Sequence, residues 1–434
     1  MFFYIKSFMK YAKIKTKDNK VFEGYLVNET SEFIIIKLKN GYNIGIRNDD
    51  ILELNKEEIE SKYENREYKK LESRNNKISI LATGGTILSK IDYRTGGVHM
   101  LTKPEELIDL APDLLDYVEI KNIEIPFSIA SEDMLPDNWI EIGKILVRLL
   151  NDDVNGVTIL HGTDTMHYTS SALSFIVKNL NKPVSITGSQ RSSDRPSSDA
   201  FFNLLSSAVY DNSDIAEIAI VMHGSSSDSF SYAHRGTKVR KMHTERRDAF
   251  QSINSLPLAK IFPYNKKIEI IDNYYRKRNN NNPYLDDKIC KKVALIKTYP
   301  GSDPDIIKYY VDKNYKGIVI EGTGFGHVPT NPTDKKYSWI ENIKYGIERG
   351  IIFVITSQTI FGRTNPFVYS NARLLYNLGV IYAEDMHPET AYVKLMYVLG
   401  HTENYEEVKK MFLTNIAGEI NEKSSYEFFN FNKD

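Results

Sequence analysis

The chain of 434 residues contains one cysteine, Cys290, which has no second thiol for an internal disulfide or for a CxxC redox or zinc motif. No stretch approaches the roughly 18 consecutive apolar residues that a membrane-spanning helix needs. Lys6 and Lys10 interrupt the apolar start of the sequence before the core of a secretion signal, about 7 to 15 apolar residues, could form. We therefore expect a cytoplasmic protein.

The sequence has no excess of charge of either sign. Lysine and arginine together number 56, aspartate and glutamate 57, and the net charge is -1. Nucleic-acid binders neutralise phosphates with clustered positive charge, so any such contact here must be local or must belong to a partner. The HExxH, GxSxG and GxxxxGK[ST] motifs are also absent, and no metal site is predicted.

The first 54 residues predict a small β-rich domain with an SH3-like barrel. Short apolar runs alternate with turns there, and Asn40-Gly41 between two of the runs is a strong hairpin signal. Residues 55–76 are almost entirely polar and carry charges of both signs. Because such a segment cannot supply a hydrophobic core, we interpret it as a charged linker.

From residue 77 onward, apolar runs alternate with amphipathic stretches, which is typical of βαβ units and parallel sheets. The apolar runs lie at residues 78–82, 157–160, 184–187, 218–222, 293–296, 317–320 and 351–355. Helical periodicity fits residues 165–180, 199–210 and 388–399. A polar, asparagine-rich stretch at 271–291 predicts a second linker. We therefore predict a large α/β domain over 77–270 and a small one over 292–434.

In open α/β sheets, ligands bind beyond the carboxyl ends of the strands, so the residues that follow each apolar run are candidates for chemistry. The first run is followed by TGGTI at 83–87, and the second by HGTDT at 161–165. A glycine pair after a strand is most often only a tight turn. The histidines at two strand ends, His161 and His223, are expected to be structural. Hydroxyl groups nevertheless cluster at this edge, which leaves threonine chemistry as the candidate.

A threonine hydroxyl is a weak nucleophile unless a base takes its proton. A neutral Lys241 could accept a proton from Thr163, provided that Lys238 and Arg240 from the same cation-rich segment lie beside it. Asp164 could orient that lysine or bind a substrate ammonium group, and the glycine-rich backbone could offer N–H donors to an oxyanion. The set suits the hydrolysis of a side-chain amide, although a basic segment is more often a solvated loop.

Between residues 77 and about 418 the chain resembles the bacterial-type L-asparaginase family, because ATGGTI and HGTDT occur in order and at a suitable separation. The resemblance implies that Thr86 is the nucleophile and that Tyr93 lies on a mobile loop that closes over the site. The implied second threonine and its partners are Thr163, Asp164 and Lys241. This family also implies asparaginase-like α/β domains with parallel sheets.

The same resemblance implies a substrate-binding pair. Ser131 and Glu132 match the position that holds the α-carboxylate and α-amino groups, although many asparaginases have glutamine where this chain has Glu132. Members of the family complete their site with a residue from a neighbouring subunit, which implies a homodimer.

The N-terminal domain and phrases such as TGSQRSSDRPSSDA and KVRKMHTERRDAFQS make the whole chain similar to the D-subunit family of archaeal glutamyl-tRNA(Gln) amidotransferases. This similarity implies a glutaminase that holds no cofactor and supplies ammonia to a synthetase/kinase-type partner subunit. The partner would use ATP and Mg to convert glutamyl-tRNA(Gln) to glutaminyl-tRNA(Gln) and would hold most of the tRNA. The implied assembly is a heterotetramer around a homodimer core.

Two other functions stay open from the sequence. The chain could be a free cytoplasmic L-asparaginase with an accessory N-terminal domain, or a catalytically dead interaction subunit whose threonines are structural. The N-terminal domain could dock the partner, touch tRNA or simply stabilise the chain.

Overall fold

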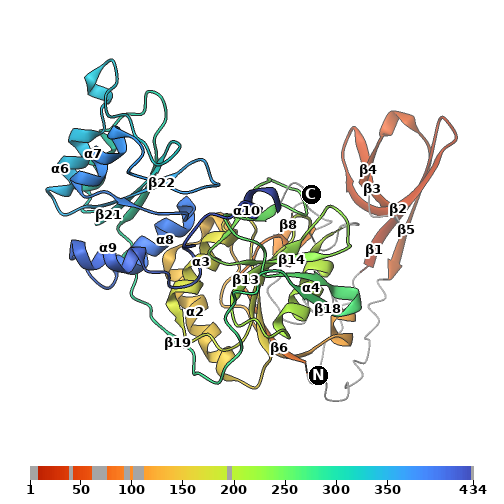
Figure 1. Ribbon diagram of the computed structural model, residues 1–434. Helices are drawn as coiled ribbons and strands as arrows, with labels where there is room; N and C mark the ends of the chain where they lie inside the picture. Colours follow the sequence, from red (N-terminus) through yellow and green to blue (C-terminus); the bar gives the residue numbers. More distant parts are fainter. Residues whose placement is uncertain are drawn as a thin grey trace.

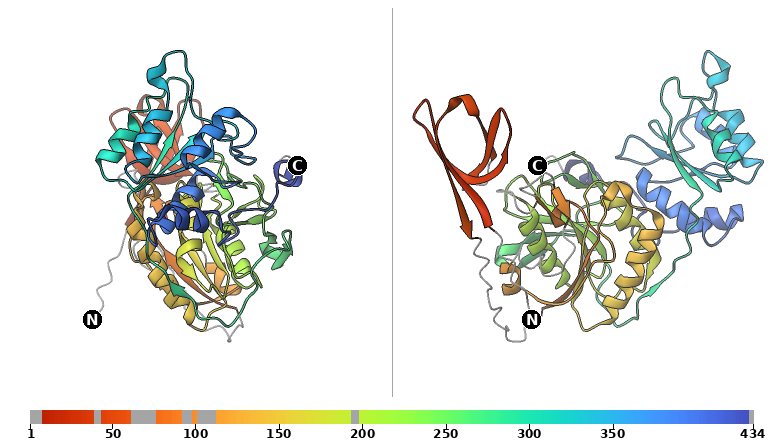
Figure 2. Two further views of the ribbon diagram at one scale, coloured as in Figure 1. Left: turned by 60° about the vertical axis from the view of Figure 1, so that its left-hand side comes forward. Right: turned by 180° about the vertical axis from the view of Figure 1, so that it is seen from behind.

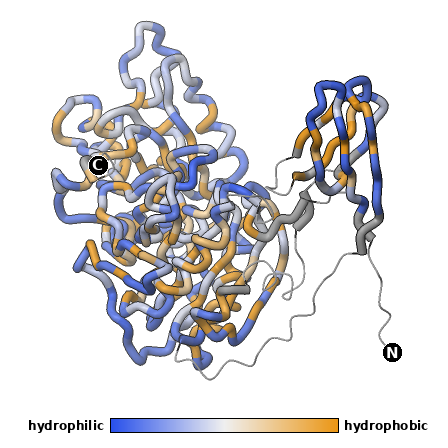
Figure 3. The backbone as a smooth tube through the Cα atoms, turned by 90° about the vertical axis from the view of Figure 1, so that its right-hand side faces the viewer, coloured by the Kyte–Doolittle hydropathy of each residue, from blue (hydrophilic) through white to orange (hydrophobic). Residues whose placement is uncertain are grey.

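The computed structural model describes residues 8–38, 43–60, 76–91, 98–100, 112–192 and 198–431. Between residues 8 and 60 the chain forms an antiparallel sheet in the order β4-β3-β2-β1-β5, curled toward a barrel (Figure 1). Its strands are β1 (Phe8–Thr16), β2 (Val21–Glu29), β3 (Phe33–Leu38), β4 (Asn43–Arg47) and β5 (Ile51–Glu60). Ala12, Ile14 and Ile36 are buried in a core of its own, and Figure 3 shows hydrophobic and hydrophilic stretches interspersed along it. This is the predicted β-rich region.

Strand β5 extends this domain beyond its predicted end at residue 54. The ladder between β5 and β1 runs from Ile51 opposite Thr16 to Glu60 opposite Phe8. The last residues of β5 are mostly charged, and one face of an antiparallel sheet can be solvated, so their composition imitates that of a linker. The predicted linker 55–76 therefore loses residues 55–60 to the strand, and its residues 61–75 lie outside those that the structure describes.

The large α/β domain is built on a mixed sheet in the order β18-β17-β14-β13-β12-β10-β6-β9. The parallel part comprises β6 (Lys77–Ala82), β9 (Glu119–Glu124), β10 (Gly156–Leu160), β12 (Val184–Thr187) and β13 (Ile218–His223). The antiparallel part comprises β14 (Ser231–Arg235), β17 (Ala259–Phe262) and β18 (Lys267–Ile270). The prediction of a parallel sheet holds only for the first part. Residues 224–230 between β13 and β14 are too few for the crossover that parallel strands require.

Helices cover both faces of this sheet (Figure 1). The helices are α2 (Pro136–Asn151), α3 (Met166–Ile176) and α4 (Ala200–Asp211). Val157 and Ile159 of β10 pack in one core with α2 and α3, whereas Leu160 packs in another with α4, because side chains alternate along a strand. Helix α4 agrees with the prediction within a residue. Helix α3 ends earlier than predicted, because the chain continues as β11 (Val177–Lys178), which pairs with β19 (Tyr284–Leu285).

The small domain, in cyan and blue in Figure 2, has a parallel sheet in the order β20-β21-β22-β23. Its strands are β20 (Val293–Lys297), β21 (Gly317–Gly322), β22 (Ile352–Ser357) and β23 (Ile381–Tyr382). Its helices are α5 (Ile306–Asp312), α6 (Ile340–Ile347), α7 (Ser370–Leu378), α8 (Pro388–Leu399) and α9 (Tyr405–Leu413). Helices α5 to α7 share a core with one face of the sheet. Helix α8, whose predicted bounds are confirmed, is buried almost all round and joins the other face to the large domain.

The predicted linker 271–291 is packed against the large domain. Ala216 donates its backbone N–H to the carbonyl of Arg276, and the guanidinium of Arg278 donates to the carbonyl of Asp211 at 2.8 Å. Asn181 donates its side-chain amide to the carbonyl of Asn281 at 2.9 Å. Leu285, Ile289 and Cys290 also pack against the hydrophobic core. Most of the segment is nevertheless polar and held by hydrogen bonds, which is why its composition predicts a linker.

The end of the chain also departs from the predicted small domain of residues 292–434. Thr237 donates its hydroxyl to the carbonyl of Ala417 at 3.0 Å, and the ring centroids of Phe431 and Tyr232 lie 5.5 Å apart. The short helix α10 (Glu427–Asn430) lies on the large domain (Figure 1). The chain after α9 therefore returns to the large domain and fastens the two domains together.

The remaining strands form short hairpins: β7 (Ser89–Ile91) with β8 (Val98–Met100), and β15 (Val239–Lys241) with β16 (Phe250–Ser252). No helix among the described residues combines the length and apolar character needed to cross a membrane.

Candidate active site

The TGGT and HGTDT motifs meet at one edge of the large sheet. Strands β6 and β10 are adjacent and parallel, so their carboxyl ends lie side by side. Both the backbone N–H and the hydroxyl of Thr83 donate to the carbonyl of Leu160 at 2.9 Å. A Cβ added to Gly85 would lie 2.5 Å from the Cα of Gly162, so the two loops are in backbone contact. This contact is possible only because Gly85 lacks a side chain, and Gly85 also has a positive φ of 84°.

Thr86 follows this contact directly and begins a short 3-10 helix, Thr86–Leu88. Its side chain is half-buried, while that of Ile87 is 3% exposed and packs in the core beneath the sheet. The buried neighbour anchors the turn. The candidate nucleophile is therefore held at the strand edge that carries the HGTDT loop.

Ser131 joins the same edge from a third segment. Ile129 donates its backbone N–H to the carbonyl of Thr83 at 3.1 Å. The carbonyl of Ser131 accepts a hydrogen bond from the hydroxyl of Thr165 at 2.6 Å, and a Cβ on Gly162 would lie 2.9 Å from the Ser131 hydroxyl. Ser131 is buried, and the side chain of Glu132 next to it is exposed. The pair predicted to bind substrate thus lies beside the two threonine loops.

Lys241 connects the cation-rich segment to this edge. Its Nζ donates to the hydroxyl of Thr163 at 2.8 Å and lies 2.9 Å from Oδ1 of Asp164. The lysine side chain is 9% exposed and that of Asp164 is 67% exposed, so the pair spans from the interior to solvent. The structure thus brings together the three residues that the sequence predicts to cooperate.

Lys238 and Arg240, whose charges were expected to disfavour protonation of Lys241, are each paired with a carboxylate. Lys238 Nζ binds Oδ2 of Asp385 at 2.7 Å, with both side chains buried, and Arg240 Nε binds Oε1 of Glu389 at 2.8 Å. Arg240 nevertheless lines the same open hollow as Lys241. Carboxylates of the small domain neutralise both cations.

The strand-end histidines are structural, as expected. Gly162 and Thr169 satisfy the two ring nitrogens of His161, at 2.7 and 2.8 Å, and burial lowers the pKa of His161 to about 4. The ring of His223 lies between Asn203 at 2.6 Å and Asp228 at 2.9 Å. Neither histidine has a free nitrogen for a metal or a substrate.

Tyr93 lies outside the residues that the structure describes, so its place over the site stays a prediction. Across the described ranges, no group of three or more histidine, cysteine, aspartate or glutamate side chains could hold a metal ion.

Sequence reasoning missed a polar cluster behind Lys241. An open hollow of about 400 Å³ is lined there by Asp164, His167, Tyr168, Arg240, Lys241, Met242, His243, Thr244 and Glu389. Burial alone would raise the pKa of Glu389, but the hydrogen bond from His387 and the positive charge of Arg240 outweigh it and lower the pKa to about 2. The available signal in the sequence is a glutamate in the first turn of a mostly apolar helical stretch.

The asparaginase-like fold is confirmed by solved structures. The thermostable L-asparaginase from Thermococcus kodakarensis has 31% sequence identity and a TM-score of 0.71, over 80% of this chain and 100% of that chain. L-asparaginase I from Vibrio cholerae has 30% identity and a TM-score of 0.68, over 80% of this chain and 99% of that one. The family models "Asparaginase, N-terminal" and "Glutaminase/Asparaginase C-terminal domain" match residues 77–276 and 292–412.

Relatives from archaea match a longer part of the chain than these L-asparaginases do. The glutamyl-tRNA(Gln) amidotransferase D-subunit of Pyrococcus abyssi is 47% identical over 98% of this chain and 97% of its own length. The protein of the same name from Methanobrevibacter smithii is 46% identical over 95% of this chain and 94% of its own length. The chain belongs to the glutamyl-tRNA(Gln) amidotransferase D-subunit family. The predicted resemblance is therefore confirmed.

Membership in this D-subunit family accounts for the N-terminal sheet. The family model "GatD N-terminal domain" matches residues 8–56, which carry strands β1 to β4 and part of β5. The two L-asparaginases each cover 80% of the chain, whereas the D-subunit relatives extend over nearly all of it. The alternative of a free asparaginase with an accessory domain is therefore the less supported one.

Proposed function

We propose that the chain is the glutaminase subunit of a tRNA-dependent amidotransferase. It hydrolyses glutamine and supplies ammonia to a partner subunit that converts glutamyl-tRNA(Gln) to glutaminyl-tRNA(Gln) with ATP. The observation that carries the proposal is the hydrogen-bonded set of Lys241, Thr163 and Asp164 beside the Thr86 loop. It occurs in a chain that matches the amidotransferase D-subunit over nearly its whole length.

The chemistry is acyl transfer in two steps. The Thr86 oxygen bonds to the γ-carbonyl carbon of glutamine, the C–N bond breaks, and nitrogen leaves as ammonia with the proton of the Thr86 hydroxyl. Water then adds to the glutamyl ester, glutamate leaves, and Thr86 regains its proton. Dividing one difficult step into two easier ones is what a covalent intermediate achieves.

Lys241 and Thr163 supply the path for these protons. The 2.8 Å hydrogen bond between their side chains is short enough for direct transfer, and both are largely shielded from water. Asp164 fixes the lysine from its exposed side. Removing one donor or acceptor from such a relay typically lowers the rate by about 10² to 10⁴.

Substrate would be held at its α-carbon end by Ser131 and Glu132. The exposed carboxylate of Glu132 suits an α-ammonium group, and the Ser131 hydroxyl suits an α-carboxylate. Tyr93 completes this proposal as the residue that closes over the bound substrate. The preference for glutamine over asparagine is part of the proposal.

The partner in this proposal is a synthetase/kinase-type subunit that binds ATP, Mg and most of the tRNA. The assembly is a heterotetramer around a homodimer of this chain, and it works in the cytoplasm. The net charge of -1 supports the division of labour, since phosphate contacts would lie mainly on the partner.

A glutaminase assay of the full chain, with and without partner, tRNA and ATP, tests the function. We expect weak hydrolysis by the chain alone, strong stimulation in the complete mixture, and loss of both in Thr86→Ala. Full activity in isolation without stimulation, or a strong preference for asparagine, would favour a free asparaginase. Hydrolysis that survives Thr86→Ala would leave the threonine with a structural role.

A further inference from the structure

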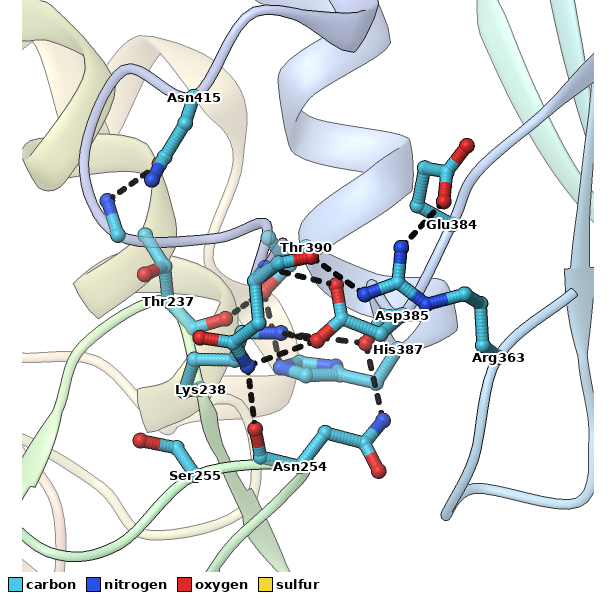
Figure 4. Close-up of polar contacts among 12 residues, drawn as sticks. Thr237, Lys238, Asn254, Ser255, Arg363, Glu384, Asp385, His387, Thr390 and Asn415 are labelled. Atoms are coloured by element: carbon cyan, nitrogen blue, oxygen red, sulfur yellow. Dashed lines mark hydrogen bonds and ion pairs between the residues drawn. The ribbon is translucent and has the colours of Figure 1, made fainter. Parts of the chain in front are cut away.

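Strand β15, which ends at Lys241, is fastened to the small domain. The carbonyl of Thr237 just before the strand accepts a hydrogen bond from the hydroxyl of Thr390 at 3.0 Å, and Lys238 pairs with Asp385 at 2.7 Å. Figure 4 shows Thr237 and Lys238 gathered with Asp385, His387 and Thr390 at this junction. The small domain therefore holds the start of the segment that carries Lys241 in place.

The ion pair between Arg240 and Glu389 extends this fastening to the residue before Lys241. The distance from Arg240 Nε to Glu389 Oε1 is 2.8 Å, and the carboxylate is 5% exposed. Its other oxygen, Oε2, bonds His387 Nδ1 at 2.9 Å, and His387 Nε2 bonds the Thr390 hydroxyl at 2.9 Å. Because Oε2 is already engaged, Glu389 presents Oε1 to Arg240 in one orientation.

The rest of β15 belongs to a small hairpin. The strand has three residues and pairs with β16, which also has three, outside the main sheet. A free hairpin of this size is marginal in water, so its order depends on the side chains that it buries. Val239 and Phe250, which pairs with Lys241 in the ladder, anchor the hairpin in the core, and Arg240 adds an anchor to the small domain through Glu389.

We propose that Arg240 and Glu389 are positioning residues. Their ion pair holds the end of strand β15 against helix α8 and so sets the contact between Lys241 and Thr163. The proposal rests on the proposed function of that contact. A displacement of about 1 Å at a reacting group can lower a rate by about 100-fold, so a small shift of Arg240 is sufficient. The arrangement couples the small domain to chemistry on the large one.

Glu389→Gln tests the proposal in the full chain, because it keeps the shape of the side chain and removes its charge. We expect kcat for glutamine hydrolysis to fall about 10- to 100-fold while KM changes less than twofold. Glu389→Asp keeps the negative charge but, with a shorter side chain, moves it away from Arg240. We expect this variant to lose activity to a similar extent. Arg240→Lys provides a second route if either variant fails to fold.

Glu217→Gln is the matched control. Glu217 is also largely buried and also binds an arginine Nε at 2.8 Å, that of Arg235, but neither residue of this pair belongs to strand β15. We expect its kcat to stay within twofold of the wild type. A similar fall in both variants would reduce Glu389 to a structural role and overturn the proposal.

A double-mutant cycle provides the decisive measurement. If Arg240 and Glu389 act as one unit, Arg240→Met and Glu389→Gln together lower kcat no further than either change alone. Multiplying effects, or effects confined to KM, would overturn the proposal. Absence of hydrolysis by the wild type in the complete mixture would instead contradict the proposed function, so the two failures are distinguishable.

Discussion

Gly85 and Gly162 are in backbone contact, and this contact places Thr86 beside the loop of Thr163. A Cβ on Gly85 would stand 2.5 Å from both the Cα and the N of Gly162. Neither backbone can yield easily, because each closely follows a buried strand of the same sheet. The separation of the two threonine loops is thus set by two residues that take no part in chemistry.

We predict that Gly85→Ala destabilises the fold by about 2 to 4 kcal/mol, from overpacking plus the strain of a positive φ, and lowers kcat at least about 10-fold. The matched control is Gly350→Ala. Gly350 has a similar φ of 79°, with nothing within 4 Å of the added Cβ, so it should cost only about 1 kcal/mol and leave kcat unchanged. Urea unfolding and a glutaminase assay measure both effects, and equal losses in the two variants would refute the role given to the contact.

We predict that Lys241→Met lowers kcat by about 10² to 10⁴, because it removes the hydrogen-bond donor to Thr163 and Asp164. Lys241→Arg keeps the positive charge, but a guanidinium does not give up its proton, so it should be nearly as inactive. Recovery of most activity in Lys241→Arg would show that the lysine acts through its charge alone. Circular dichroism and thermal unfolding provide the check that both variants fold.

The sequence could predict what depends on local pattern. Buried parallel strands have continuous apolar runs, so the predicted bounds of β12 and its neighbours agree with the structure almost to the residue. Helix α8 is predictable because Pro388 begins it and its apolar pattern continues to Leu399. The motifs after β6 and β10 lie together as predicted, because parallel strands bring their carboxyl ends to one edge.

What the sequence could not predict depends on contacts between distant segments. Strand β5 is charged at its end, and only its ladder with β1 shows that it is a strand. Lys238 and Arg240 resemble free cations in the sequence because Asp385 and Glu389 lie far along the chain. The composition of a sequence gives the number of charges but not which of them form ion pairs. The ion pairs that hold the Lys241 segment are therefore visible only in the tertiary structure.

We predict that stability falls as the pH is lowered from 6.5 toward 4. Burial lowers the pKa of His161 to about 4 and those of His167 and His234 to about 3, so these side chains stay neutral when folded. Unfolded histidines take up protons below about 6.5, so acid favours the unfolded state. Asp211 has the opposite effect on stability, because burial raises its pKa to about 7. Between about pH 4 and 7 the folded state therefore binds one more proton at this residue than the unfolded state.

The histidines outnumber the aspartate, so a net excess of about two protons in the unfolded state gives at most about 3 kcal/mol per pH unit. Urea unfolding between pH 4.5 and 7.5 measures this slope. His234→Gln, which can keep the bond to Ser252, should reduce it by about one proton. A stability profile that is flat below pH 6.5 would contradict the prediction.

We predict that removing residues 1–76 leaves basal glutamine hydrolysis but abolishes stimulation by the partner. The N-terminal sheet has its own core, around Ile14 and Ile36, so its loss need not disturb the strands that carry the site. The measurements are hydrolysis with and without partner, tRNA and ATP, and co-elution of this chain with its partner. Unchanged complex formation would assign the domain to stabilisation instead of docking.

We predict that Asp211→Asn stabilises the protein at pH 8 and has little effect at pH 4. The carboxylate is fully buried and accepts hydrogen bonds from Thr158 at 2.5 Å and Ser185 at 3.0 Å, which only partly offset the burial that raises its pKa. Because the folded pKa lies above the unfolded one, folding is penalised increasingly as the pH rises from about 4 to 7, by at most about 4 kcal/mol. The amide avoids this penalty, since the hydroxyls of Thr158 and Ser185 can rotate to suit it.

The free energy of unfolding at the two pH values decides this last prediction. Asp214→Asn is the control, because Asp214 lies three residues later and its side chain is exposed, so its change should be small at both pH values. A loss of stability in Asp211→Asn at pH 8 would mean that the hydrogen bonds to the ionised carboxylate outweigh its desolvation. The comparison therefore measures the free-energy cost of burying the ionised carboxylate of Asp211, and not the geometry of its hydrogen-bond partners.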